Sequence, residues 1–350
     1  MKAYRKVLSL AIVFALVLGL AACGGSPGGE AGPAGDGGSG GAGESITLLC
    51  ANAAAPDQAV TVALEHFVEV VKERTGGAVV IDLQSNGALG SEEETIESGM
   101  MGTIDLVVVG SAAAGGTIPE YCVCDFPFAF ETPEDAYAFY DGEIGRMLFE
   151  KAAEVGLIGL AYAENGFRNM TNNVREIHTP EDMKGLKMRT QSAQIYMDMM
   201  NALGASATPI PYGELYTALQ QKTVDGQENP IGNIYSARLY EVQKYITLDR
   251  HTYDSNIIFL SEASLDKLSD EQVEIIKTAA YECAVESREI NNANEAMWME
   301  EMEKAGVVIT SLTSEEHALF VEATKDVYKD FIDVAGEDFV NAYLEAIGRK

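Results

Sequence analysis

The chain has little positive charge. Its 350 residues carry 24 Lys and Arg against 54 Asp and Glu, which gives a formal net charge of −30 at pH 7. Because Lys and Arg supply most contacts to the phosphate backbone, we expect no nucleic-acid partner. An acidic field also repels small anions, but physiological salt screens it beyond about 8 to 10 Å. Any affinity for an anion therefore has to come from individual arginines.

Catalytic and metal-binding motifs are also missing. The chain has no Gly-x-Ser-x-Gly elbow, no His-Glu-x-x-His pair and no Walker A loop. The run 110–116 resembles a Gly/Ala-rich loop but lacks the Lys-Ser/Thr that phosphate binding needs, and the four histidines are scattered. Its Cys-x-Cys pair has no further ligands at zinc-site spacing. We therefore expect neither an enzyme nor a metal or cofactor.

The chain lacks long apolar runs beyond its first residues. Lys2, Arg5 and Lys6 precede an apolar run over residues 7–20, which is shorter than the about 20 residues of a membrane span. Leu-Ala-Ala-Cys then ends at Cys23 and matches the bacterial lipobox. This pattern predicts an export signal over residues 1–22 and a diacylated Cys23. An ordinary signal peptide with an incidental cysteine is the alternative.

Residues 24–43 are nearly all Gly, Ala, Ser and Pro. Such a segment buries nothing, so we expect a flexible tether that holds the domain roughly 25 Å from its anchor. Docking onto a membrane partner then becomes nearly intramolecular. Removing the signal, which has three cations and no acid, leaves a net charge of −33.

Four cysteines remain besides Cys23. Cys50 and Cys283 lie in apolar patterns, and Cys122 and Cys124 form the Cys-x-Cys pair. We expect buried free thiols, although one disulfide is possible outside the cytoplasm.

From residue 44 onward the chain is long enough for two domains, each with its own core. Short β-type runs (46–51, 78–83 and 104–109) alternate with helical patterns such as 57–74. This alternation predicts α/β architecture with mostly parallel sheets.

Helix starts share one chemistry, a hydroxyl at the N-cap followed three residues later by an acid or an amide. The residues in this position are Ser91, Thr132, Thr179, Ser269 and Thr313. The segment 270–304 follows one of these starts and contains neither Pro nor Gly. It predicts one helix of about 50 Å that crosses from one domain to the other.

Arg189 follows a predicted short strand, 186–188. Ligands of open α/β sheets bind beyond the carboxyl ends of strands, and Arg189 lies at such an end. Asn229, just before Pro230, offers a carboxamide on a predicted rigid turn that could reach the same ligand, and Pro230 restricts it to extended conformations. The alternative is a surface arginine paired with one of the many acids.

Several segments, in this order, resemble the solute receptors of tripartite ATP-independent periplasmic (TRAP) transporters. They are Asp-Phe-Pro-Phe at 125–128, Glu-Asn-Gly-Phe-Arg-Asn-Met at 164–170, Gly-Leu-Lys-Met-Arg at 185–189, Ala-Leu-Gly-Ala at 202–205, Glu-Leu-Tyr-Thr-Ala-Leu-Gln-Gln at 214–221 and Val-Asp-Gly-Gln-Glu-Asn-Pro at 224–230. The resemblance implies a periplasmic-binding-protein-like α/β fold with two domains, a hinge and a long domain-spanning helix.

The resemblance also implies a ligand site. Arg189 matches the arginine that forms a bidentate salt bridge with the substrate carboxylate, and Asn229 matches an asparagine that donates to the same group. Arg168 matches a position that often carries a second ligand-contacting arginine, with an interdomain ion pair as the alternative. Tyr212 matches an aromatic that packs on the ligand, with plain core packing as the alternative.

Two further residues complete the candidate set. Ser192 follows Gln191 in a pair closer to receptors for C4-dicarboxylates and sugar acids than to those for sialic acid, which carry Val-Pro-Asn there. Asn52, at the end of the first strand, could supply a polar contact from the other domain or lie in a solvated loop. Neither residue decides between the two ligand classes.

We therefore expect an extracytoplasmic, lipid-anchored receptor that binds an organic-acid anion and delivers it to TRAP membrane subunits. A lipid-tethered sensor with the same site is the alternative, and a receptor for an ATP-driven importer is disfavoured by the resemblance. The predicted domains are 44–165 with 254–292, and 166–253 with 293–350.

Overall fold

The computed structural model describes residues 45–348, so the predicted signal, Cys23 and the tether lie outside the described residues. The strands are β1 Ile46–Asn52, β2 Val79–Gln84, β3 Leu106–Gly110, β4 Leu157–Asn172, β5 Lys187–Thr190, β6 Ser206–Pro209, β7 Gly226–Pro230, β8 Tyr245–Ser261 and β9 Val308–Ser311. The α-helices are α1 Ala59–Arg74, α2 Glu92–Met100, α3 Ser111–Thr117, α4 Pro133–Tyr140, α5 Glu143–Ala153, α6 Pro180–Met183, α7 Gln194–Ala202, α8 Leu215–Gln220, α9 Ile231–Ser236, α10 Asp270–Lys304, α11 Ser314–Thr324, α12 Ile332–Ala335 and α13 Glu337–Ala346. Short 3-10 helices are η1 Pro119–Asp125, η2 Tyr212–Glu214, η3 Leu239–Glu241, η4 Glu262–Lys267 and η5 Val327–Phe331.

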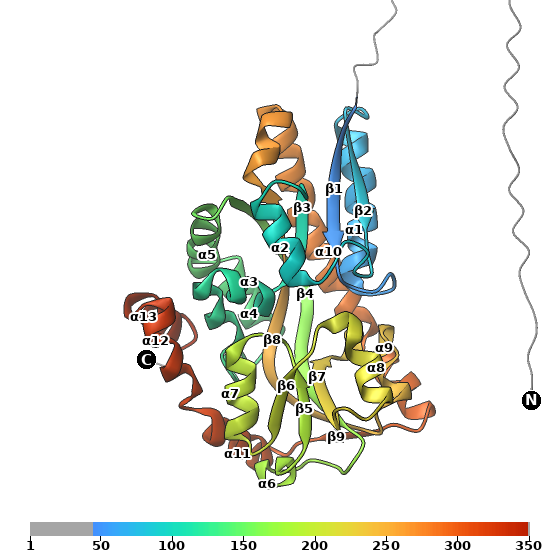
Figure 1. Ribbon diagram of the computed structural model, residues 1–350, viewed down its shortest axis with the longest axis vertical. Coiled ribbons are helices and arrows are strands. Elements are labelled where there is room, and N and C mark those ends of the chain that lie inside the picture. Colours follow the sequence, from blue (N-terminus) through green and yellow to red (C-terminus); the bar gives the residue numbers. More distant parts are fainter. Residues whose placement is uncertain (1–44, 349–350) are drawn as a thin grey trace, which may run out of the picture. The chain divides into compact units, whose positions relative to one another are not determined.

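One sheet runs through the described residues in the order β2-β1-β3-β8-β4-β7-β5-β6, and β9 pairs with β8. Figure 1 shows β1 to β3 at one end and β5 to β7 at the other, with the long strands β4 and β8 passing through both parts. These two strands are antiparallel to each other, and each has one further antiparallel neighbour, β3 for β8 and β7 for β4. The sheet is therefore mixed: five of the eight strand pairs among the described residues are parallel, in line with the prediction of mostly parallel sheets, and the three others are antiparallel.

We call lobe 1 the part built on β1, β2 and β3, with residues 157–164 of β4 and 255–261 of β8. Lobe 2 is built on β5, β6, β7 and β9, with residues 166–172 of β4 and 245–254 of β8. The predicted α/β fold with two domains is confirmed, and both lobes share one sheet. The domain boundaries in the sequence stay a prediction.

Local sequence chemistry sets most element boundaries. Complete capping boxes are present at Ser91, Thr132, Ser269 and Thr313, as predicted. The run 110–116 was expected to be a loop, but it forms most of α3. Three consecutive alanines, which are the best helix formers, explain this outcome, because they occupy the first turn of α3 just after Ser111, and Gly110 caps the helix in an extended conformation.

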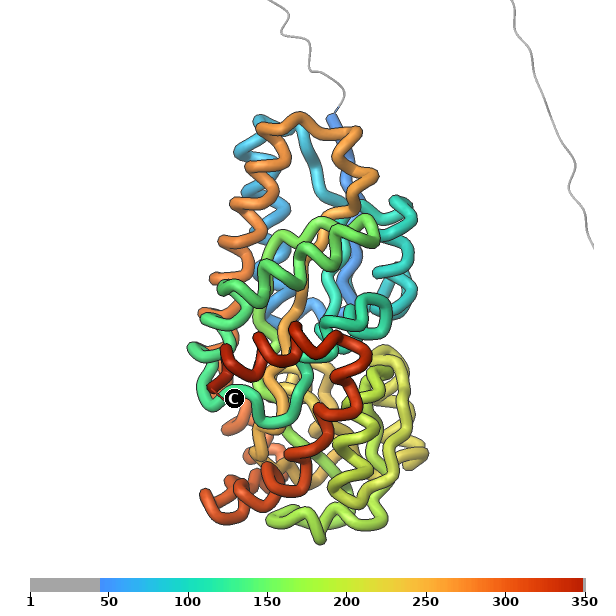
Figure 2. The backbone as a smooth tube through the Cα atoms, turned by 90° about the vertical axis from the view of Figure 1, so that its left-hand side faces the viewer, coloured from blue at the N-terminus to red at the C-terminus, as the bar shows by residue number. Residues whose placement is uncertain are grey.

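The helix α10 spans both lobes, as predicted. Its 35 residues, at 1.5 Å per residue, cover about 52 Å. Ile276 and Ala280 belong to the lobe 1 core that also contains Leu64 of α1. Trp298 and Met302, several turns later, belong to the lobe 2 core. Figure 2 shows α10 running alongside α1 before it reaches lobe 2.

The C-terminal helices connect the lobes a further time. α11 packs against α6 and α7 in lobe 2, whereas α12 and α13 pack against η1, and α13 also against α5 (Figure 2). The rings of Phe126 and Tyr343 meet edge to face at 5.0 Å in this contact. Within residues 45–348, no helix is both long and apolar enough to cross a membrane.

The four described cysteines are buried free thiols, as expected. Burial raises the pKa of Cys50 to about 12. A thiol with so high a pKa stays protonated at neutral pH and is a poor nucleophile.

Candidate functional site

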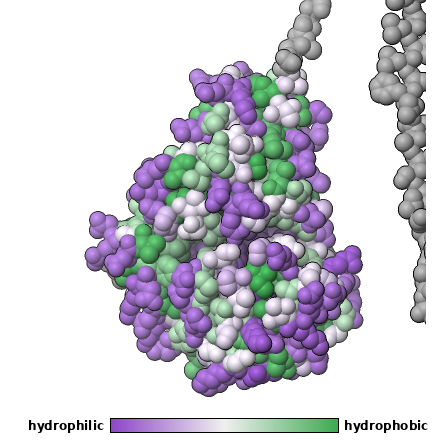
Figure 3. All heavy atoms as spheres, viewed as in Figure 1, coloured by the Kyte–Doolittle hydropathy of each residue, from purple (hydrophilic) through white to green (hydrophobic). Residues whose placement is uncertain are grey.

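A cavity of about 730 Å³ lies between the lobes. A recess of about 30 Å³ shares Arg189, Gln191, Tyr212 and Glu92 with its lining. On the face seen in Figure 3, hydrophilic residues gather at the waist between the two lobes. Loops from both lobes therefore contribute to one polar site.

Arg189 lies at the carboxyl end of β5, as the sequence predicted, and is only 2% exposed. Its Nε donates to the Ile210 carbonyl at 2.8 Å. Its Nη1 is buried and has no hydrogen-bond partner among residues 45–348, and no carboxylate there forms an ion pair with it. Burial lowers the pKa of Arg189 to about 10, despite the opposing effect of Glu228. A buried cation with unused donors is costly unless an anion binds it.

Other side chains of this cavity, like Arg189, have buried polar atoms without a hydrogen-bond partner within the described residues. Gln191 Nε2 is buried without a partner within the described residues. Tyr212 lines both the cavity and the recess, its hydroxyl is buried without a hydrogen-bond partner in the described part of the chain, and burial raises its pKa. Since nearly all buried polar groups in proteins are hydrogen-bonded to protein, water or ligand, these donors are available to a polar ligand that enters the cavity.

Asn229 is buried in β7 and lines the recess. The sequence placed it on a turn, but it lies in a strand that ends at Pro230, the N-cap of α9. Its Oδ1 accepts a bond from Arg168 Nη2 at 3.2 Å, and its Nδ2 donates to Gln227. One hydrogen of Nδ2 remains for a further acceptor.

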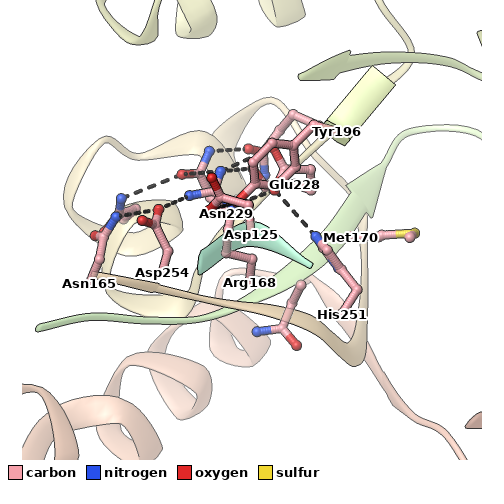
Figure 4. Close-up of polar contacts among 12 residues, drawn as sticks. Asp125, Asn165, Arg168, Met170, Tyr196, Glu228, Asn229, His251 and Asp254 are labelled. Atoms are coloured by element: carbon pink, nitrogen blue, oxygen red, sulfur yellow. Dashed lines mark hydrogen bonds and ion pairs between the residues drawn. The ribbon is translucent and has the colours of Figure 1, made fainter. Parts of the chain in front are cut away.

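Arg168 is 1% exposed and its guanidinium is paired with two carboxylates (Figure 4). Nε donates to Glu228, Nη2 lies 3.0 Å from Glu228 Oε1, and Nη1 lies 2.6 Å from Asp254 Oδ2. Burial alone would raise the pKa of Glu228, but Arg168 and His251 outweigh it and lower that pKa to about 2. Arg168 also lines the recess, yet its charge is balanced by the protein itself.

The ion pairs of Arg168 extend into a buried polar network that joins the lobes. Ser111 Oγ donates to Asp254 Oδ1 at 3.1 Å and lies 2.6 Å from Asp125 Oδ1, which also accepts from the Tyr196 hydroxyl at 3.0 Å. Burial raises the pKa of Asp125 to about 8, and Asp254 adds to this effect. Figure 4 shows that these side chains converge from several elements onto Arg168.

The remaining predicted residues differ in where they lie. Ser192 is exposed and lines the cavity. Asn52 is buried, and its carboxamide donates to Thr61 Oγ1 at 2.8 Å and accepts from the Ala54 amide at 3.1 Å. It is not among the residues that line the cavity or the recess. Five of the six predicted residues therefore line the cavity or the recess, namely Arg189, Asn229, Arg168, Tyr212 and Ser192. Asn52 does not.

Sequence reasoning missed Glu92, which lines both the cavity and the recess. Its only sequence signal is an acid directly after the N-cap Ser91, which is a common way to begin a helix. Within residues 45–348, no group of three or more His, Cys, Asp or Glu residues is arranged to hold a metal ion.

Comparisons with known proteins agree with this geometry. Residues 50–333 match the family model described as bacterial extracellular solute-binding protein, family 7. The chain is 30% identical over 310 residues to the C4-dicarboxylate-binding periplasmic protein of Rhodobacter capsulatus, which covers 87% of this chain and 91% of that protein.

Solved structures give the same result. The sugar acid binding protein of Advenella mimigardefordensis strain DPN7T, in complex with galactonate, is 33% identical with a TM-score of 0.84, over 87% of this chain and 99% of that one. A TRAP periplasmic solute binding protein of Polaromonas sp. JS666, bound to D-erythronate, is 36% identical with a TM-score of 0.81, over 85% and 98%. These relatives are solute-binding proteins rather than enzymes.

Proposed function

Because the chain belongs to the bacterial extracellular solute-binding proteins of family 7, we propose that it is the extracytoplasmic solute receptor of a TRAP transporter. Its ligand is a small organic-acid anion, a C4-dicarboxylate or a sugar acid such as a uronate or an aldonate. The observation that carries the proposal is the buried guanidinium of Arg189, which lies in a cavity between two lobes and has no ion pair within residues 45–348. The ligands of the three relatives above support the same class.

Arg189 holds the ligand carboxylate. Its Nε is already bonded to the Ile210 carbonyl, so the two terminal nitrogens remain for a pair of parallel hydrogen bonds. A lysine in its place would present a point charge and lose both one bond and the fixed orientation.

Asn229 donates its second Nδ2 hydrogen to the same carboxylate, and Tyr212 packs against the ligand. Arg168 acts mainly as a positioning residue, because its ion pairs with Glu228 and Asp254 use its charge while Nη2 holds the Asn229 carboxamide. Ser192 contributes at the cavity edge, and Asn52 acts only through the loop that it holds.

Ligand binding draws the two lobes together. The moving parts are the domains predicted from the sequence, 44–165 with 254–292 and 166–253 with 293–350. Closure removes water around Arg189 and so strengthens its ion pair with the ligand. Greater affinity for the closed state shifts the population, and the membrane subunits recognise that state. A lipid on Cys23 keeps the receptor at the membrane.

Isothermal titration calorimetry against organic acids tests the proposal. Each charge-assisted hydrogen bond contributes about 1.5–3 kcal/mol, so we expect Arg189→Ala to weaken binding by ~3 kcal/mol or more, and Arg189→Lys by at least about 1.5 kcal/mol. Arg175→Ala, an exposed arginine outside the cavity, is the matched control. Unchanged affinity in a folded Arg189→Ala protein would refute the assignment.

A lipid-tethered sensor of organic acids would use the same cavity. Uptake by liposomes that contain the TRAP membrane subunits distinguishes the two functions, because a sensor would not support transport.

A further inference from the structure

The cavity contains more negative than positive side chains. Its lining carries five carboxylates and two guanidiniums, namely Asp57, Glu92, Glu93, Glu94, Glu214, Arg189 and Arg238. Arg238 has a side chain that is 71% exposed and pairs with Glu241 at 3.5 Å. Arg168, in the adjoining recess, is balanced by two buried carboxylates. In the described part of the chain, Arg189 is thus the one buried arginine of this site without an ion pair.

Glu92 lies on the lobe 1 side of the site, opposite Arg189. It begins α2, and its Oε1 accepts a hydrogen bond from the Gly110 amide at 2.8 Å. Oxygens of Glu92 and of Gln191 lie 3.6 and 3.8 Å from the point where a side chain at Gly110 would begin. Glu92 of lobe 1 and Gln191 of lobe 2 therefore both lie beside Gly110 in the lining of the recess.

A structural role at the start of α2 explains the position of only one of the two carboxylate oxygens of Glu92. An acid in the first turn stabilises the helix dipole, and the Gly110 bond engages Oε1. Oε2 has no hydrogen-bond partner among residues 45–348. Glu92 and Arg189 attract each other electrostatically, but within residues 45–348 the two side chains do not form an ion pair. A ligand can therefore contact both residues at once.

We propose that Glu92 is a specificity-determining residue, and that the site takes a polyhydroxylated monocarboxylate rather than a dicarboxylate. The inference rests on the proposed function, because it assumes that Arg189 binds the carboxylate. Oε2 of Glu92 then accepts a hydrogen bond from a hydroxyl further along the ligand. Gln191 Nε2 is a second partner for such hydroxyls.

A dicarboxylate is disfavoured because its second charge has no counterion. Its distal carboxylate would face Glu92, and like charges at close range in a partly desolvated site repel strongly. A hydroxyl in the same place gains a charge-assisted hydrogen bond to Oε2 instead. Sites that hydrogen-bond a ligand hydroxyl reject analogues without it, because their own polar groups are left unpaired.

The environment of Glu92 agrees with this role. Burial raises its pKa to about 7, although the Gly110 amide lowers it, and Asp254 raises it further. Above about pH 7 the side chain is ionised, so there it accepts a hydrogen bond from a hydroxyl and repels a second carboxylate. A structural N-terminal acid on an exposed helix would not need such an environment.

Competitive calorimetry with erythronate, galactonate and succinate tests the proposal, using the full mature chain freed of bound ligand. We expect the wild-type protein to prefer the hydroxylated monocarboxylates at least tenfold. Glu92→Gln removes the charge while keeping the shape, so it should weaken their binding about tenfold and strengthen succinate binding by a similar factor. Glu92→Ala should change the preference in the same direction. Glu97→Gln, exposed on the same helix, is the matched control.

The outcomes separate this inference from the function on which it rests. If no organic acid binds, or if Arg189→Ala leaves binding unchanged, the proposed function fails. If acids bind through Arg189 but the wild-type protein prefers succinate, or if Glu92→Gln and Glu92→Ala both keep the wild-type preference in folded protein, only the role of Glu92 fails.

Discussion

Replacing Arg189 or Arg168 by methionine should change the stability of the ligand-free protein in opposite directions. Both side chains are at least 98% buried. Arg168 has Glu228 and Asp254 as counterions, whereas Arg189 has no ion pair within residues 45–348. Methionine fills much of the same volume without charge, so each substitution reports chiefly on the electrostatic environment.

The magnitude for Arg189 follows from its pKa. Burial lowers that pKa to about 10, from an ordinary value of about 12.5, and at about 1.4 kcal/mol per tenfold the buried charge costs ~3 kcal/mol. The group stays charged at neutral pH, so the cost is fully present there. Methionine removes it but also loses the bond to the Ile210 carbonyl, which contributes about 1 kcal/mol. We therefore expect Arg189→Met to stabilise the ligand-free protein by about 2 kcal/mol.

Arg168→Met should have the opposite effect. It leaves the buried Asp254 without its counterion and Glu228 with His251 alone, and breaking a buried ion pair from one side typically costs about 3–5 kcal/mol. Urea unfolding of protein that has been unfolded, dialysed free of ligand and refolded measures both changes. The exposed Arg175→Met is the control and should stay within about 0.5 kcal/mol of wild type.

A loss of stability in ligand-free Arg189→Met would refute the reasoning. It would mean that the protein itself compensates the charge of Arg189, so that this arginine is structural rather than reserved for an anion.

Two further predictions concern the packing around the site. Burial raises the pKa of Glu164 from about 4.5 to about 7, although the hydroxyls of two tyrosines lower it. The folded protein therefore binds the Glu164 proton more tightly than the unfolded chain does. Its free energy of unfolding should fall as pH rises from about 4.5 to about 7. Urea unfolding across this pH range should show that Glu164→Gln removes up to ~3 kcal/mol of that fall, whereas the exposed Glu65→Gln should not change it. If the pH dependence of stability in Glu164→Gln matches that of the wild type, the raised pKa of Glu164 is wrong. A Cβ on Gly226 would lie 2.2 Å from the Thr171 carbonyl oxygen, so Gly226→Ala should shift β7 and destabilise the protein by about 1–3 kcal/mol. A wild-type melting temperature for this variant would count against that packing.

Features set by nearby residues could be predicted from the sequence. A hydroxyl and an acid three residues apart are enough to begin a helix, so the capping boxes at Ser91, Thr132, Ser269 and Thr313 were found. The uninterrupted segment that became α10 contains no residue that ends a helix. Arg189 could be placed because a short strand leads directly to it.

Features set by distant residues could not. Arg168 pairs with Glu228, 60 residues away, and with Asp254, 86 residues away, and neither spacing has a sequence signal. Glu92 reaches the site only because the fold brings α2 against β3. The sequence did not show which strands carry the sheet through both lobes, because β8 pairs with β4 along its whole length but changes its second partner from β9 to β3, and no periodicity records such a change.

The two lobes are joined by paired backbone rather than by a loose linker. Three register shifts interrupt the ladder between β4 and β8. One, between Gly159 and Ala161, lies within lobe 1, whereas those between Glu164 and Gly166 and between Arg168 and Met170 lie near the junction of the lobes. We expect torsion of this two-stranded ribbon to concentrate there, because bending at an interruption breaks no ladder bond. Arg168 lies at one of these points and forms ion pairs with carboxylates on β7 and β8, the two strands next to β4. These ion pairs hold the lobe 2 side of the junction rigid, and lobe 1 reaches them through the hydrogen bond from Ser111 to Asp254. We therefore expect lobe closure to bend the ribbon beside this cluster and to leave its ion pairs intact.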